Sequence, residues 1–414
     1  MLREIVIYIS AYIGLFAVTF YFLNLIRKPR EKPLAFDESK AEKITIIIPA
    51  FNEEKGIAKT IESALSVDYP KNKLEIIVVD DGSRDRTFEI ASKFKNRGVR
   101  VFRKKVNGGK GAAINLGIKN AKGSIIFTMD ADNTIIEKKA LRIMAPYFQD
   151  KRVMCVAPIM AIYKPKGVLQ RVQQIEYLLG VFLRKSFANM NAVHITPGAF
   201  SAYRKEFFDK YGGFEEHNLT EDLEIALRIQ SHHYMIQNTL NTVVFTVAPN
   251  KFNALLKQRR RWYTGLMKNF WKYKNLFSRQ YGALGTIVLP TAIVTVIISV
   301  FLTLYLAIRS LIEIKKELIL LESVNFNFLN ALELNKFVFE RFVFNFSSDP
   351  ISLFFVLFTF IVFGYMIFAR RKVKEELRIK ISFVLFSALY AFLFAFWWIV
   401  SIFYVLLNRK VSWR

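Results

Sequence analysis

Two aspartates at the end of an apolar run are the residues best placed for chemistry in this chain. Asp130 and Asp132 follow Ile125–Met129. In an extended strand residues i and i+2 point to the same face, so both carboxylates could reach one cation. Mg²⁺ and Mn²⁺ prefer oxygen ligands and commonly bridge carboxylates to phosphate. The pair therefore predicts a divalent-metal site for a phosphorylated ligand, with an ordinary acidic turn as the alternative.

Polar residues also follow two neighbouring apolar runs. Asn52 and Glu53 follow the first run, which ends at Pro49, and Asp80 and Asp81 follow the second. Acidic turns often only cap helices. Carboxylates gathered at several strand ends, however, repel one another unless a cation or hydrogen-bond donors separate them. The combination predicts a shared ligand site.

A glycine-rich segment, Asn-Gly-Gly-Lys-Gly, surrounds Lys110. Its backbone N–H groups could surround a phosphate at the start of a helix, with the Lys110 ammonium beside it. The spacing and the missing Ser or Thr exclude a Walker A loop. A plain glycine turn before a helix is the alternative.

A second acidic pair, Glu221 and Asp222, follows Thr220. Thr220 is a favourable N-cap, and acidic residues suit the first turn of a helix. A structural role therefore explains the pair. The functional alternative makes Asp222 a general base.

A basic helix is predicted around Gln258, Arg261 and Trp262, because apolar residues recur there at helical spacing. One interpretation is an amphipathic helix on the membrane surface. In the other interpretation, Arg261 neutralises a diphosphate and Trp262 stacks on a sugar. The two interpretations are compatible with each other. A second amphipathic stretch, 169–183, is also expected at the interface.

The elements that must position these residues alternate between strand and helix from residue 43 onward. This order predicts an α/β domain with a mainly parallel sheet, covered by helices on both faces. In such sheets ligands bind beyond the carboxyl ends of the strands, where the acidic residues lie. Ser83 is expected to cap the helix after the second strand.

The chain is also rich in apolar segments, with 53% hydrophobic residues and 40 Phe among 414 residues. We expect four membrane spans, at 5–26, 281–308, 351–369 and 381–407, because each is long enough to cross a bilayer. The resulting division is a span and linker at 1–42, a cytoplasmic α/β domain at 43–280 and a membrane region at 281–414. The segment 309–350 has no assigned role.

Basic residues set the expected orientation. They gather after the first span, at Arg27, Lys28, Arg30 and Lys32, and between the last two, from Arg370 to Lys380. The positive-inside rule places both groups, and the α/β domain, in the cytoplasm. The net charge of +26 also suits anionic lipid or a sugar diphosphate. The single Cys155 excludes an intrachain disulfide and is expected in the core.

The motifs, taken in order, resemble glycosyltransferase family 2, and within it the membrane synthases of cellulose, chitin, hyaluronan and poly-N-acetylglucosamine. They span Ile44 to Trp262 and are IPAFNE at 48–53, VDDGS at 79–83, NGGKG at 107–111, DAD at 130–132, GAFSAYR at 198–204, TED at 220–222 and QRRRW at 258–262. The sequence departs from the usual synthase pattern after Thr196, where it reads Pro-Gly-Ala-Phe. Acceptor details do not carry over there.

The resemblance implies a GT-A-type domain that inverts the anomeric carbon and uses a nucleotide diphosphate sugar, a UDP-sugar in first place, with Mg²⁺ or Mn²⁺. The nucleotide sugar would lie against Pro49, Asn52, Glu53, Asp80, Asp81, Lys110 and Asp130, with Asp81 at the nucleobase. Asp130 and Asp132 would hold the metal, and Asp222 would deprotonate the acceptor. Gln258, Arg261, Trp262 and Glu221 would line the acceptor side.

Three questions stay open at this stage. The acceptor is a growing glycan or, alternatively, a polyprenyl phosphate or glycolipid that receives one sugar. The alternative to an enzyme is a basic membrane-anchored binding module. It would explain the net charge but not the acidic residues at the strand ends, which would repel nucleic acid. A homo-oligomer or partner subunit would be needed if four spans are too few for a polymer channel.

Overall fold

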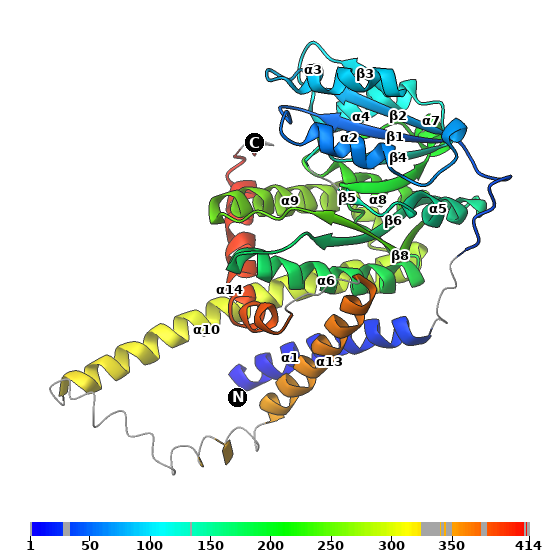
Figure 1. Cartoon of the computed structure of the whole chain (residues 1–414). Coiled ribbons are helices and arrows are strands. Elements are labelled where there is room, and N and C mark those ends of the chain that lie inside the picture. The colour runs from blue at the N-terminus through cyan, green and yellow to red at the C-terminus, as the bar shows by residue number, and fades with distance from the viewer. Residues whose placement is uncertain are drawn as a thin grey trace.

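The computed structural model describes residues 2–27, 34–132, 135–323, 340, 343–344, 350–373, 379–409 and 411. In this part of the chain, eight strands form one sheet in the order β3-β2-β1-β4-β7-β6-β8-β5 (Figure 1). Their bounds are Ile44–Ala50 (β1), Leu74–Asp80 (β2), Arg100–Arg103 (β3), Ile125–Met129 (β4), Ile135–Ile136 (β5), Val153–Ile162 (β6), Phe200–Arg204 (β7) and Met235–Thr246 (β8).

The half of the sheet that carries the acidic strand ends is parallel, as predicted. Strand β1 pairs in parallel with β2 and β4, and β2 pairs in parallel with β3. Strand β7 then inserts antiparallel between β4 and β6, while β6 and β8 are parallel again. Every residue of β1 is buried, which explains why its β-branched run does not alternate with polar residues. The predicted mainly parallel α/β fold is confirmed.

Helices cover both faces of the sheet. They are α2 (Ile57–Leu65), α3 (Thr87–Ser92), α4 (Gly109–Asn120), α5 (Ala140–Met144), α7 (Lys205–Tyr211) and α8 (Glu221–Ser231). Because side chains alternate along a strand, Ile46 and Ile48 enter the core beneath α2, whereas Ile47 enters the other core, which α4 and α8 cover. Cys155 is fully buried in that second core, as predicted.

Two amphipathic helices are long, α6 (Val168–Asn189) and α9 (Phe252–Lys272), and Figure 1 shows α6 between the strand β8 and the helices α1 (Leu2–Arg27) and α13 (Pro350–Val373). Helix α6 packs against the sheet strands β6 and β8 and also against α1, α13 and α14. Helix α9 packs against α8 and α14. Both stretches predicted to be interfacial thus connect the sheet domain with the apolar helices.

The apolar helices are α1 (Leu2–Arg27), α10 (Leu289–Ser323), α13 (Pro350–Val373) and α14 (Ile379–Leu406). Within the described residues, three helical stretches are long and apolar enough to span a membrane: Tyr8–Arg27, Leu284–Lys316 and Lys380–Leu406. The span predicted at 351–369 lies in α13, which is not among these three. Residues 309–323 continue α10, and most of 324–349 lies outside the described residues, as do Lys28, Arg30 and Lys32.

Candidate active site

The ammonium group of Lys110 is the centre of a charged cluster at the carboxyl ends of the strands. Its Nζ lies 2.6 Å from an oxygen of Asp130 and 3.6 Å from an oxygen of Glu221, and it donates to the carbonyl of Gly198 at 3.1 Å. Lys110 is in the first turn of α4, Asp130 directly follows β4, and Glu221 begins α8. Three elements that are distant in the sequence thus place their polar residues in one site.

Surrounding carboxylates keep Lys110 charged. Burial opposes the charge, but the carboxylates of Asp130, Glu221 and Asp222 raise the pKa of Lys110 well above its ordinary value. Burial raises the pKa of Glu221 to about 7, and Asp222 adds to this effect, while Lys110 and Arg261 oppose it. The site therefore holds more acid groups than its lysine alone can neutralise near neutral pH.

Asp130 and Asp132 fit a divalent cation. Desolvation within the site and, after it, the carboxylates of Asp130 and Glu53 together raise the pKa of Asp132 to about 7, although its surface is exposed. A bound cation would relieve this repulsion. Among the described residues, no three His, Cys, Asp or Glu side chains are grouped to hold a metal ion. The protein would thus supply two carboxylates, with phosphate and water oxygens completing the shell.

Asp81 binds the glycine-rich loop from within the protein. Its carboxylate accepts hydrogen bonds from the N–H groups of Gly108 at 3.1 Å and Gly109 at 2.7 Å, and it pairs with Lys104 at 2.6 Å. These N–H groups were the predicted phosphate ligands. In this structure Asp81 accepts these hydrogen bonds, as the alternative of a glycine turn before a helix implies, and a role of the loop in phosphate binding stays a prediction.

Asp80, at the end of β2, is also engaged by the protein. It is fully buried, and one of its oxygens lies 3.2 Å from Nε of Arg103. Pro49 lies beside it in the sheet, paired with Val79. The predicted contact of Asp80 and Asp81 with a nucleoside would require both aspartates to exchange partners that they hold in this structure.

The turns after β1 and β2 are held together by side chains. Asn52, with a left-handed φ of 54°, donates its N–H to the hydroxyl of Ser83 at 2.9 Å and accepts from the N–H of Arg84 at 2.9 Å. The N–H of Glu53 donates to the Thr87 hydroxyl at 2.7 Å. Ser83 therefore joins two turns and does not cap α3, contrary to prediction. These hydrogen bonds hold the two turns together at the edge of the sheet where the ligand is expected.

Asp222 has one oxygen fixed and one facing the cluster. Its Oδ1 accepts the N–H of Leu223 at 2.9 Å. A Cβ atom added to Gly198 would lie 2.7 Å from Asp222 Oδ2 and 3.1 Å from Lys110 Nζ. Any side chain at position 198 would therefore force these charged groups to move, and this close approach explains why glycine occupies the position.

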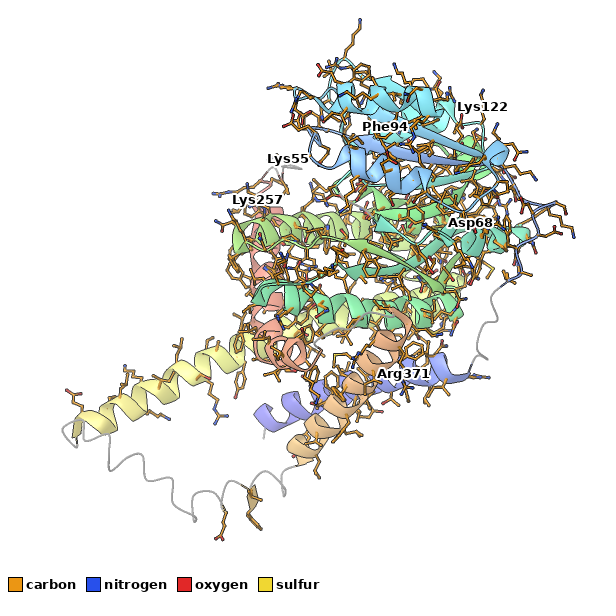
Figure 2. The ribbon with its side chains drawn as sticks, viewed as in Figure 1. Lys55, Asp68, Phe94, Lys122, Lys257 and Arg371 are labelled. Atoms are coloured by element: carbon orange, nitrogen blue, oxygen red, sulfur yellow. The ribbon has the colours of Figure 1, made fainter. Side chains whose placement is uncertain are left out.

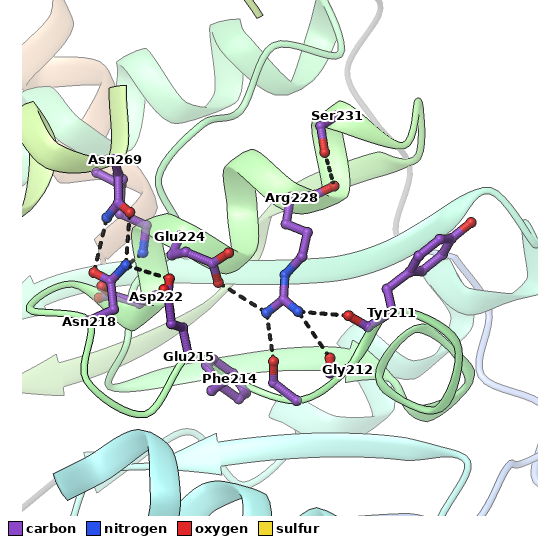
Figure 3. Close-up of polar contacts among 12 residues, drawn as sticks. Tyr211, Gly212, Phe214, Glu215, Asn218, Asp222, Glu224, Arg228, Ser231 and Asn269 are labelled. Atoms are coloured by element: carbon purple, nitrogen blue, oxygen red, sulfur yellow. Dashed lines mark hydrogen bonds and ion pairs between the residues drawn. The ribbon is translucent and has the colours of Figure 1, made fainter. Parts of the chain in front are cut away.

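The loop before α8 is anchored by contacts that the sequence analysis missed (Figure 3). Arg228 donates to the carbonyls of Tyr211 at 2.9 Å and Gly213 at 2.6 Å, and it pairs with Glu224 at 3.0 Å. The spacing of Glu224 and Arg228, four residues apart on a helix, was the available signal for this pair. Arg228 thereby fixes the loop that leads into Glu221 and Asp222.

Helix α9 is tied to the same loop. Asn269 donates to Asn218 at 3.1 Å and to the hydroxyl of Thr220 at 3.0 Å. Thr220 is the N-cap residue of α8 but makes no side-chain capping bond, so the predicted cap is wrong. Its hydroxyl instead links α8 to α9. Arg261, one of the predicted acceptor-side residues, donates to the carbonyl of Leu219 at 3.1 Å.

The most deeply buried residue of the QRRRW segment is Arg259, which was not predicted. It is 1% exposed and pairs with both carboxylate oxygens of Glu176 on α6, at 2.9 and 2.7 Å. Its guanidinium also lies over the ring of Trp262, 4.4 Å from the ring centre, and 5.3 Å from that of Trp397 on α14. Arg259 thus holds Trp262 in place, while Gln258 is half-buried on the same helix.

Comparison with known proteins agrees with this geometry. Residues 45–212 match the family model described as Glycosyl transferase family 2. A solved mannosyltransferase from Pyrobaculum calidifontis, in complex with GDP-Man and Mn²⁺, is 19% identical with a TM-score of 0.57, covering 91% of this chain and 100% of that one. The sheet and its helices thus have the fold of a glycosyltransferase of the GT-A type.

The curated relatives are more specific. The chain is 27% identical over 274 residues to a poly-beta-1,6-N-acetyl-D-glucosamine synthase of Staphylococcus epidermidis, covering 64% of this chain and 65% of that protein. It is 29% identical over 263 residues to the synthase of the same name from Staphylococcus aureus, covering 63% of each. The chain therefore spans just under two thirds of the length of these relatives. Residues 45–212 are thus similar to glycosyltransferase family 2, as the motifs predicted.

Gly198→Ala tests the geometry of the cluster. The added methyl group should displace the Asp222 carboxylate and the Lys110 ammonium, and displacements near 1 Å can lower turnover roughly 10²-fold. Sugar transfer and the melting temperature should be measured on one preparation. Gly167→Ala is the matched control, because a Cβ there meets nothing within 4 Å. Unchanged turnover in Gly198→Ala would show that the cluster is not where the reaction takes place.

Proposed function

We propose that this chain is a membrane-embedded, inverting glycosyltransferase. It transfers a sugar from a nucleotide diphosphate sugar, a UDP-sugar in first place, to a glycan or a lipid-linked acceptor. The observation that carries the proposal is the cluster of Lys110, Asp130, Glu221 and Asp222 inside a family 2 domain. With the neighbouring Asp132, the cluster combines two carboxylates suited to a metal, a cation suited to phosphate and a half-buried carboxylate, Asp222, suited to a base.

Departure of the diphosphate requires its growing negative charge to be neutralised. Asp130 and Asp132 would hold Mg²⁺ or Mn²⁺, which supplies this neutralisation when it is bound. Mn²⁺ accompanies GDP-Man in the mannosyltransferase of the same fold. Lys110 adds a fixed positive charge beside Asp130. Pro49, Asn52 and Glu53, at the neighbouring strand end, complete the proposed nucleotide-sugar site.

Attack on the anomeric carbon from the opposite side requires a base on that side. Asp222 suits this role, because the N–H of Leu223 fixes one oxygen and the other oxygen faces the cluster. Glu221 is buried and lies 3.6 Å from Lys110, so an acceptor reaches it less readily. Gln258, Arg261 and Trp262 would then form the acceptor side of the site.

The named relatives are polymer synthases, which favours a growing glycan as the acceptor. Transfer of a single sugar to a polyprenyl phosphate is the second candidate. The division at residues 42 and 280, the cytoplasmic orientation, and a homo-oligomer or partner subunit belong to the same proposal.

A panel of nucleotide sugars tests the reaction. The full chain in detergent should release nucleotide diphosphate from one member of the panel in the presence of Mg²⁺ or Mn²⁺, and EDTA should abolish the release. Asp132→Asn should lower it at least about 10²-fold with an unchanged melting temperature, because it removes charge from the proposed cation site. Full release in EDTA would contradict the metal assignment. No release from any nucleotide sugar would favour a binding module.

Asp222→Asn separates a base from a structural residue. Asn can accept the Leu223 N–H but cannot accept a proton, so turnover should fall roughly 10²–10⁴-fold. Donor affinity should change little, and the loss of stability should stay below about 1 kcal/mol. Initial rate, donor binding and melting temperature decide between the two roles. Near-normal turnover in Asp222→Asn would transfer the role to Glu221, to be tested as Glu221→Gln.

Labelling of single cysteines tests the orientation. Lys122 lies on the surface of the sheet domain and Arg371 lies at the basic end of α13, and both are exposed (Figure 2). We expect Lys122→Cys and Arg371→Cys to react with an impermeant maleimide in inverted vesicles and not in intact cells. The native Cys155 is fully buried and gives a low background. Opposite accessibility of the two sites would show that the spans are miscounted.

A further inference from the structure

Helix α6 carries a half-buried arginine, Arg184, that pairs with no carboxylate in the part of the chain that the structure describes. The Nε and Nη2 atoms of Arg184 are buried and have no hydrogen-bond partner among the described residues. Burial lowers the pKa of Arg184 to about 10, and the only charge effect that opposes this comes from the Tyr177 phenol. The guanidinium is therefore still a cation at neutral pH.

A second arginine of this interface provides a comparison. Arg259 on α9 is buried more completely than Arg184, and it pairs through two hydrogen bonds with Glu176 on α6. An unpaired charge removed from water costs several kcal/mol, so a structural arginine normally has such an acid. Arg184, on the same helix as Glu176, has none. This contrast indicates that the missing anion belongs to a ligand.

The position of Arg184 places that ligand next to the proposed active site. Arg184 and Tyr177 are seven residues apart, so they lie on one face of α6. Tyr177 packs against the core cluster that contains Phe200, at the site end of β7. The charge of Asp132 also acts on the Tyr177 phenol. The face of α6 that bears Arg184 is thus the face turned toward the metal-binding carboxylates.

The surroundings of Arg184 favour a phosphate on a lipid. A planar guanidinium binds phosphate oxygens through two parallel hydrogen bonds. Gly180 leaves the guanidinium uncovered on one side, since a Cβ there would lie 3.4 Å from Nη1. Helix α6 also packs against the apolar helices α1, α13 and α14. A ligand at this place can therefore have its phosphate at Arg184 and its chain along apolar helices.

We propose that Arg184 binds the phosphate group of a lipid-linked acceptor that lies along α6. This inference rests on the proposed function and deepens it, because it selects the second candidate acceptor, a lipid phosphate, over the growing glycan that the relatives favour. The donor diphosphate is the other source of such an anion. Its proposed site, however, already contains Lys110, Asp130 and Asp132, so Arg184 is assigned to the acceptor.

Binding of farnesyl phosphate and farnesol to the full chain in detergent tests the inference without turnover. We expect the wild type to bind the phosphate at least about tenfold more tightly than the alcohol, and Arg184→Gln to lose this preference, because the charge-assisted hydrogen bonds are gone. Arg184→Lys should keep part of the preference. Arg171→Gln, on the same helix, is the control and should keep all of it. Equal binding of the two lipids by the wild type would overturn the inference.

A second variant tests the same inference in case Arg184→Gln does not fold. Gly180→Leu keeps the charge and fills the space beside the guanidinium, so it should also weaken farnesyl phosphate binding about tenfold or more. UDP and GDP binding should be measured on every variant. A matching loss of nucleotide affinity in Arg184→Gln would assign the anion to the donor and overturn the inference. Absence of nucleotide binding in the wild type would instead count against the proposed function, while the lipid comparison stands by itself.

Discussion

The ion pairs of Lys110 are the interaction on which the site depends. Asp130, Glu221 and Asp222 come from the end of a strand and the start of a helix that are about ninety residues apart in the sequence. Carboxylates gathered in a partly buried site repel one another strongly unless a cation separates them. Lys110 supplies that cation from the first turn of α4. One side chain therefore connects the parallel half of the sheet to the helix that carries the candidate base.

A second ion pair connects two elements in the same way, next to the apolar helices. Arg259 and Glu176 join α9 to α6, and the Arg259 guanidinium lies between Trp262 and Trp397 of α14. Breaking a buried pair of this kind leaves an uncompensated charge, which costs about 3–5 kcal/mol. Trp262, which is proposed to lie on the acceptor side, is thus connected to an apolar helix through Arg259. The amphipathic helices act as a rigid connection between the sheet domain and the apolar helices.

Residue types and their local periodicity predicted most of the fold and the edge where the site lies. The runs around Ile46, Ile77 and Phe127 could be assigned to strands because they are short, apolar and ended by polar residues. Long-range pairing decided the features that were predicted wrongly. Ser83 and Thr220 have the right types for caps, but Asn52 and Asn269 engage their hydroxyls. Asp81 likewise accepts hydrogen bonds from the N–H groups of a loop whose local sequence left a phosphate site and a plain glycine turn as alternatives.

The positively charged side chains of this protein differ in how nearby carboxylates balance their charge, and this difference distinguishes a structural role from a role in ligand binding. Lys110 is surrounded by acids that exceed its own charge, and that excess of negative charge suits a metal ion. Arg259 is matched by one carboxylate, which suits a purely structural role. Arg184 has neither kind of partner among the described residues, so the positive charge on its face of α6 remains uncompensated. The proposed donor site thus has an excess of negative charge on the sheet side, and the proposed acceptor site has an excess of positive charge on α6.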